Sequence, residues 1–243
     1  MMTKKDKTPV STGKGEVEAS NAEDIERFLS QVKSRPAPSG GGTRGRLVFG
    51  MDATMSRQPT WDAACNLQGQ MFAETAAIGG LDVQLIFFRG FGECKASRWA
   101  SDPRTLSSIM SKVDCRGGHT QIGRVLSHIR KVHKKKPVNA AVYVGDAMEE
   151  DIDHLCALAG ELGLINVPLF MFQEGHDMVA EPAFREIARL SGGAYCRFDA
   201  SSARQLRDLL SAVAVYAAGG RKALQDFSAT SGGQVRALLG QMK

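Results

Sequence analysis

From residue 46 onward, short apolar runs alternate with segments of helical periodicity, and this alternation limits the possible folds. Apolar runs typical of buried strands occur at 47–51, 83–88, 140–144, 168–172 and 194–198. Amphipathic helical patterns separate most of them, most clearly at 122–132. Strands that alternate with helices pair in parallel through right-handed crossovers. The sequence therefore predicts an α/β fold with a three-layer, doubly wound, mostly parallel sheet.

The two ends of the chain differ from this central region. Residues 1–45 are polar and rich in Ser, Gly and Pro, so we expect a disordered linker with one possible short helix at 23–32. The domain itself is predicted over 46–218, followed by a partly helical tail at 219–243. A weaker, more polar strand pattern at 93–99 suits a short antiparallel strand at the sheet edge.

Composition excludes several classes of protein. Of the 243 residues, 43% are hydrophobic and 23% are charged, as in ordinary globular domains. The apolar runs are too short to span a bilayer, and no secretion signal is recognisable. The five cysteines form no C-x-x-C pair. We therefore expect no zinc site or disulfide framework, and a reduced, cytoplasmic protein.

The net charge of +5 permits an acidic partner but does not identify one. The densest basic run, at 130–136, closes a predicted helix, where cations favour the negative end of the helix dipole. No aromatic residues interleave with it, so a nucleic-acid partner is not expected. We interpret the run as a solvated helix end.

Two aspartates follow apolar strands directly, Asp52 after the first predicted strand and Asp146 after the fourth. In a doubly wound sheet, ligands bind at the carboxyl ends of the strands, near the point where the strand order reverses. A carboxylate there needs a cation or hydrogen-bond donors. Both residues are thus candidate ligands, although each is also explained by an ordinary capping or turn aspartate.

Hydroxyl groups surround these aspartates in the sequence. Thr54 and Ser56 follow Asp52 at two and four residues, and Thr120 lies in a Gly-Gly loop that leads into a helix. Together with Asp146 they form an oxygen-only set, which suits Mg²⁺ or Mn²⁺. Such a set, with some ligands acting through water, can leave one coordination position for an incoming carboxylate.

This combination of residues resembles the metal-ion-dependent adhesion site of the von Willebrand factor type A (VWA) domain, in the form found in bacterial intracellular proteins. The resemblance covers about residues 45–218. It implies a six-stranded sheet with the metal at its upper edge, hydroxyl ligation by Thr54, Ser56 and Thr120, and aspartates that act directly or through water. It further implies a non-enzymatic interaction module whose partner completes the metal shell with an acidic side chain.

The sequence departs from the family pattern at three places. Thr54 stands where Ser is usual, His119 lies between the glycines and Thr120, and Val144-Gly145-Asp146-Ala147 replaces the usual Thr-Asp-Gly. No departure removes an oxygen ligand. We expect His119 to be a solvent-facing loop residue, and Met55 to pack beneath the motif.

The alternative function is a Mg²⁺-dependent phosphohydrolase of the haloacid dehalogenase type, which also places an aspartate after its first strand. That chemistry needs a second carboxylate two residues later as a general acid, but this position holds Thr54. A dinucleotide-binding dehydrogenase is disfavoured because no G-x-G-x-x-G follows the first strand.

Overall fold

The computed structural model describes residues 44–76, 80–198 and 203–230. Its elements, in chain order, are β1 (Gly45–Asp52), the 3-10 turn η1 (Met55–Arg57), α2 (Gln58–Thr75), β2 (Leu81–Arg89), β3 (Glu93–Ala100), α3 (Pro103–Met110), α4 (Ile122–Lys135), β4 (Ala140–Gly145), α5 (Ile152–Leu164), β5 (Leu169–Glu174), α6 (Ala180–Ser191), β6 (Tyr195–Phe198) and α7 (Ala203–Thr230). The short helix predicted at 23–32 lies outside the described residues.

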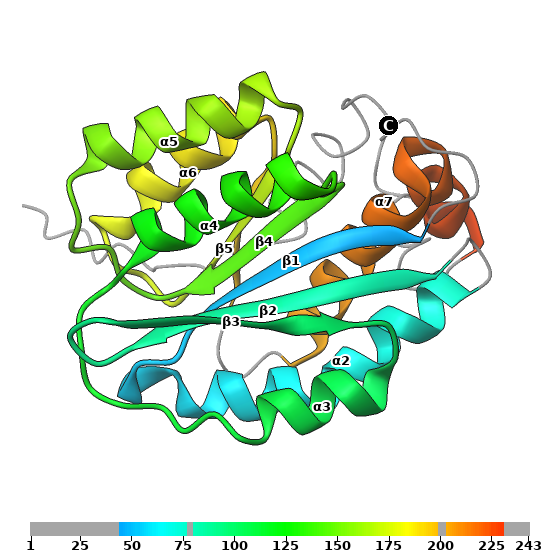
Figure 1. Cartoon of the computed structure of the whole chain (residues 1–243), viewed down its shortest axis with the longest axis horizontal. Coiled ribbons are helices and arrows are strands. Elements are labelled where there is room, and N and C mark those ends of the chain that lie inside the picture. The colour runs from blue at the N-terminus through cyan, green and yellow to red at the C-terminus, as the bar shows by residue number, and fades with distance from the viewer. Residues whose placement is uncertain (1–43, 77–79, 199–202, 231–243) are drawn as a thin grey trace, which may run out of the picture.

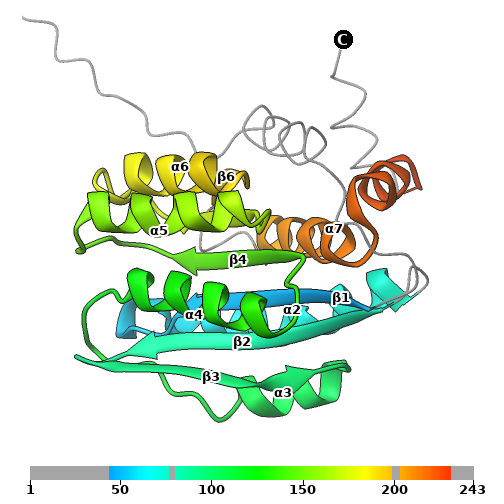
Figure 2. The ribbon, with the colours of Figure 1, turned by 45° about the horizontal axis from the view of Figure 1, so that its top comes forward.

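One six-stranded sheet forms the centre of the structure, in the order β3-β2-β1-β4-β5-β6. All neighbouring strands pair in parallel except β2 and β3, which are antiparallel. The strand β3 is the more exposed edge strand, as its polar pattern predicts (Figure 2). The predicted doubly wound sheet with one antiparallel edge strand is confirmed.

Helices cover both faces of this sheet, with α4, α5 and α6 on one face and α2, α3 and α7 on the other (Figure 1). Side chains alternate along the strands, so Phe49 of β1 faces one helical layer and its neighbour Val48 faces the other. Both are fully buried, which explains why the parallel strands are continuous apolar runs. Cys196 and Cys115 are buried as free thiols, whereas Cys65, Cys94 and Cys156 are only half-buried.

The last helix extends further than the predicted core helix. The helix α7 runs to Thr230, but it is interrupted at Gly220, where φ is 69° and ψ is −160°. A positive φ is strained for residues with a Cβ and is tolerated by glycine. No helix among the described residues has the length and apolarity to span a membrane.

The topology brings the two candidate aspartates together. From β1 the chain proceeds to β2 and β3 on one side, and β4, β5 and β6 occupy the other side. The strand order therefore reverses between the neighbours β1 and β4, where Met51 pairs with Val144. Asp52 ends β1 and Asp146 follows β4, so both stand at the switch point, where doubly wound folds bind ligands.

Candidate metal centre

Asp52 is the most buried residue of the candidate site, with 1% of its surface exposed. Its Oδ1 accepts a hydrogen bond of 2.7 Å from the backbone N–H of Thr54. Its Oδ2 has no hydrogen-bond partner within the described parts of the chain. Burial raises the pKa of Asp52 to about 6, against hydrogen bonding from Thr54, which lowers it. A carboxylate held in this way requires compensation, and a cation at Oδ2 would supply it.

Ser56, which follows β1, lies next to Asp146, which follows the neighbouring strand β4. The Ser56 hydroxyl donates a hydrogen bond of 2.8 Å to Asp146 Oδ2. The Thr54 hydroxyl lies 3.4 Å from that of Ser56. The turn η1 curls the chain after Asp52 over the strand end, and this turn directs both hydroxyls to the same place. Four of the five predicted ligands therefore form one connected cluster.

Thr120 lies at the same sheet edge, but its hydrogen bonds run to Glu149 in the loop after β4. The Thr120 hydroxyl accepts a bond of 3.0 Å from the Glu149 N–H, and the Thr120 N–H donates to Glu149 Oε2 at 3.1 Å. A hydroxyl oxygen has two lone pairs, so one stays available to a metal ion. The loop is thereby held in place from the β4 side.

The segment before Thr120 is packed closely on the neighbouring loops. The Arg116 N–H donates to Ala53 O at 3.0 Å, and the His119 N–H donates to Gly90 O at 3.3 Å. A Cβ at Gly118 would lie 2.1 Å from the Gly90 carbonyl oxygen, whereas Gly117 has nothing within 4 Å. Only glycine allows this approach at position 118, and it brings the loop of Thr120 over the ends of β1 and β2.

Arg57 lies beside the candidate site and is not among the residues that the sequence singled out. It follows Ser56 directly and is 1% exposed. Its Nη1 forms an ion pair with Glu174 at the end of β5, and the Thr60 hydroxyl donates to the same carboxylate. Burial lowers the pKa of Arg57, while the nearby carboxylates of Asp146 and Asp52 raise it. The pattern of the sequence gives no sign that this arginine is buried.

Tyr143 explains one departure from the family pattern. Its side chain is fully buried, and its hydroxyl has no hydrogen-bond partner within the described residues. A Cβ at Gly145 would lie 2.6 Å from this hydroxyl. The space that a side chain at position 145 would need is therefore taken by Tyr143, so glycine precedes Asp146 here.

The consecutive acidic residues after β4 have different roles. Asp151 caps α5, and its Oδ1 accepts the His154 N–H at 2.7 Å. Glu150 instead reaches α4, where its carboxylate accepts the N–H groups of Ile122 and Gly123. The start of α4 has no side-chain cap of its own. Glu150 therefore satisfies donors that the helix leaves free and complements its dipole.

Two expectations for the surroundings of the site have different outcomes. His119 is solvent-facing as predicted, with 66% of its side chain exposed, and its Nδ1 lies 3.0 Å from Glu149 Oε2. The prediction for Met55 is wrong, because it is 63% exposed. It begins η1, whose tight turn buries Arg57 beneath the site and leaves Met55 outside.

The donor set fits a hard divalent cation. Within the described residues, no three Asp, Glu, His or Cys side chains gather closely enough to hold a metal ion. An ion at this edge would therefore depend on hydroxyl oxygens in addition to Asp52 and Asp146. Mg²⁺ and Mn²⁺ accept such a set and retain water in the remaining positions. The orphaned Oδ2 of Asp52 gives the cation a buried anionic ligand.

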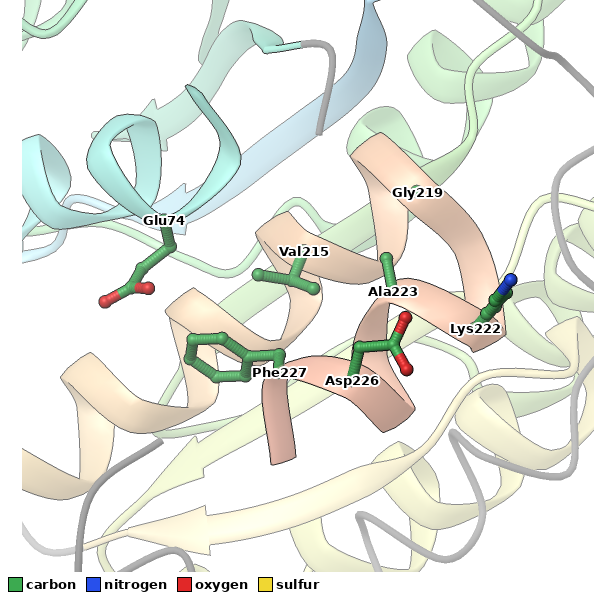
Figure 3. Close-up of a pocket in the computed structure, with 7 residues that line it drawn as sticks. All are labelled: Glu74, Val215, Gly219, Lys222, Ala223, Asp226 and Phe227. Carbon is green, nitrogen blue, oxygen red and sulfur yellow. The ribbon is translucent and has the colours of Figure 1, made fainter. Parts of the chain in front are cut away.

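A hollow in the structure lies away from the candidate metal centre. It has a volume of about 500 Å³ and is lined by the end of α2 and by the region of α7 near its interruption (Figure 3). Glu74, Lys222 and Asp226 line it together with Phe227. The helix α2 starts at the carboxyl edge of the sheet and ends at the opposite edge, so this hollow is remote from Asp52.

Comparison with known proteins shows similarity in structure alone. No protein-family model matches the chain, and no curated protein matches its sequence. Among solved structures, the SpRpn10 VWA domain matches with a TM-score of 0.54 and 15% identity, over 69% of this chain and 94% of that one. The vWF domain of the pilus tip protein Mfa5 from Porphyromonas gingivalis matches with a TM-score of 0.54 and 8% identity, over 73% and 97%.

Proximal thread matrix protein 1 from the mussel byssus, in a structure with a zinc-occupied MIDAS motif, gives a TM-score of 0.57 at 14% identity. That match covers 71% of this chain and 46% of the mussel protein. At such identities the comparison establishes the fold. The chain thus has a VWA fold, with a six-stranded, mostly parallel sheet between two layers of helices.

Proposed function

We propose that the chain is a non-enzymatic interaction module that binds Mg²⁺ or Mn²⁺ through Asp52, Thr54, Ser56, Thr120 and Asp146. The metal would hold an acidic side chain of a partner protein. The buried Oδ2 of Asp52, which has no partner among the described residues, is the observation that carries the proposal. The zinc-occupied MIDAS motif of the mussel protein with the same fold supports a divalent metal at this edge.

The arrangement favours binding over hydrolysis. A phosphohydrolase would need a general acid two residues after Asp52, and that position carries the Thr54 hydroxyl. Arg57, which follows Ser56 directly, is 1% exposed and paired with Glu174, and such a buried cation is not open to a phosphate group from solvent. All five cysteines are free, which agrees with the reducing, cytoplasmic setting that we propose.

Calorimetric titration with Mg²⁺ and with Mn²⁺ tests this function. We expect one site in the wild type, and at least about tenfold weaker binding in Asp52→Asn and Asp146→Asn, because each loses a charged ligand. Asp153→Asn is the control, since this exposed aspartate lies on α5 outside the cluster. Absence of binding by both metals would refute the site. Phosphatase activity that disappears in Asp52→Asn would favour the hydrolase instead.

A further inference from the structure

Exposed apolar side chains gather at the carboxyl edge of the sheet. Within the described residues, the large hydrophobic side chains left exposed are Met55 (63%), Phe91 (85%), Leu164 (85%), Met178 (83%) and Val179 (59%). Leu164 ends α5 at the opposite edge, and the other four lie in loops at the carboxyl edge. Single exposed hydrophobic residues are ordinary, but a group of them at one edge marks an interaction surface.

These four residues, which we call the apolar rim, flank the candidate metal centre on both sides. Phe91 follows β2, and Met178 and Val179 follow β5, while the metal centre lies between them on β1 and β4. Neighbouring strands are about 4.8 Å apart, so the ends of β2 and β5 each lie about 7 Å from the midpoint between β1 and β4. Met55 adds an apolar side chain beside the hydroxyl cluster itself.

Phe91 is attached to the loop that carries Thr120. Its ring packs edge-on against that of His119, with 5.2 Å between the centroids and an interplanar angle of 68°. The backbone beneath is tied as well, because the His119 N–H donates to Gly90 O. The apolar rim and the loop of Thr120 therefore form a joint surface.

The charges around the site limit the kind of partner. The loop after β4 carries Glu149, Glu150 and Asp151 in succession, and Asp177 is exposed in the loop after β5, whereas the exposed Arg116 at this edge is already paired with Asp114. Additional acidic groups of a partner would face these carboxylates at a cost. The net charge of +5 would suit a polyacidic partner, but the local charges at this edge disfavour one.

We propose that the partner segment is an extended peptide with a single acidic residue and a bulky apolar residue two positions to either side. In an extended chain, side chains two residues apart point the same way and are separated by about 6.6 Å. This spacing is close to the distance of about 7 Å from the midpoint between β1 and β4 to the ends of β2 and β5, after which the rim residues follow. The proposal rests on the function proposed above, because the acidic residue would bind the metal.

Three capped heptapeptides test the proposal by NMR titration of the full chain in saturating Mg²⁺. Their sequences are Gly-Leu-Gly-Asp-Gly-Leu-Gly, the same peptide with Ser for both Leu, and the same peptide with Asp for both Leu. We expect the leucine peptide to bind about tenfold more tightly than the other two. Equal or weaker binding of the leucine peptide would overturn the inference.

Matched variants locate the contact. Phe91→Ser and Met178→Ser should each remove part of the advantage of the leucine peptide over the serine peptide, because each removes one flank of the rim, and both should leave Mg²⁺ binding unchanged. Leu164→Ser is the control, because it is as exposed as Phe91 but lies at the opposite edge. Unchanged peptide affinity in both rim variants would overturn the inference.

The outcomes separate this inference from the proposed function. If Mg²⁺ does not bind, the proposed function fails and the inference fails with it. If Mg²⁺ binds but the leucine peptide has no advantage, only the inference fails. A Mg²⁺-dependent dimer in sedimentation, abolished by Phe91→Ser, would show that the rim holds a second copy, and this result would also overturn the inference.

Discussion

At the residue scale, the candidate site contains two buried charged side chains, Asp52 and Arg57. Asp52 and Arg57 are each about 1% exposed, and they lie five positions apart on either side of the exposed hydroxyl of Ser56. Arg57 pairs with Glu174 through Nη1 but leaves Nε and Nη2 without hydrogen-bond partners in the described structure, and Asp52 likewise retains one oxygen without a donor. Arg57 therefore packs beneath the loop that carries Ser56, and the Oδ2 atom of Asp52 remains available to a ligand.

The ion pair between Arg57 and Glu174 should contribute strongly to stability. We expect Arg57→Met to lower the free energy of unfolding by about 3–5 kcal/mol, because Glu174 stays buried without its counterion. The double variant Arg57→Met/Glu174→Leu should recover part of the loss. Urea denaturation measures both effects.

A second ion pair in the same chain serves as the control. Arg130 and Glu161 pair across α4 and α5, with 37% and 46% of their side chains exposed. Arg130→Met should cost at most about 1 kcal/mol, because solvent screens an exposed pair. Similar losses in Arg57→Met and Arg130→Met would contradict the role assigned to burial.

At the element scale, loops rather than helices or strands assemble the site. The segment before α4 is bonded to Ala53 after β1 and to Gly90 after β2, and Glu149 and Glu150 reach it from the loop after β4. These contacts join the ends of three neighbouring strands. The position of Thr120 is therefore decided by packing between loops.

Gly118→Ala should disturb this assembly. The added methyl group would overlap the Gly90 carbonyl, so we expect a loss of stability of about 1–3 kcal/mol and weaker Mg²⁺ binding as Thr120 moves. Gly117→Ala is the neighbouring control, because a methyl group there meets nothing within 4 Å. Thermal unfolding and calorimetry measure the two effects. Wild-type behaviour of Gly118→Ala would show that the close approach is dispensable.

At the scale of the whole molecule, a bound metal should couple the two halves of the sheet. The switch point lies between β1 and β4, and the candidate ligands come from both sides of it. A ligand that binds only the folded state stabilises it in proportion to its occupancy. Metal binding should therefore appear as a change in global stability.

We expect Mg²⁺ at about 100 times its dissociation constant to add about 2.7 kcal/mol to the free energy of unfolding. Asp52→Asn should lose this dependence on Mg²⁺. Without metal it should be at least as stable as the wild type, because it removes a buried carboxylate with an unpaired oxygen, and with Mg²⁺ it should gain little. Denaturant unfolding with Mg²⁺ and with chelator checks both parts. An equal gain in wild type and variant would place the metal elsewhere.

Much of the fold was predictable, because continuous apolar runs are required of parallel strands that are buried on both faces. The polar pattern of β3 likewise predicted an edge strand. The prediction that Met55 packs beneath the motif was wrong, because the order of Thr54, Met55 and Ser56 in the sequence does not show which side chains of a tight turn face solvent. Arg57 was missed because a local pattern cannot show a counterion such as Glu174, which lies 117 positions away in the sequence.

The sequence by itself determined the doubly wound sheet and the candidate ligands at its carboxyl edge, because strand and helix periodicities are local properties of the chain. The tertiary structure alone decided how those ligands are held. It joined Ser56 to Asp146 and Thr120 to Glu149 through hydrogen bonds. It also buried Arg57 against Glu174 and left Met55 exposed to solvent. Such contacts depend on which strand ends become neighbours, and this is fixed only when the whole sheet assembles.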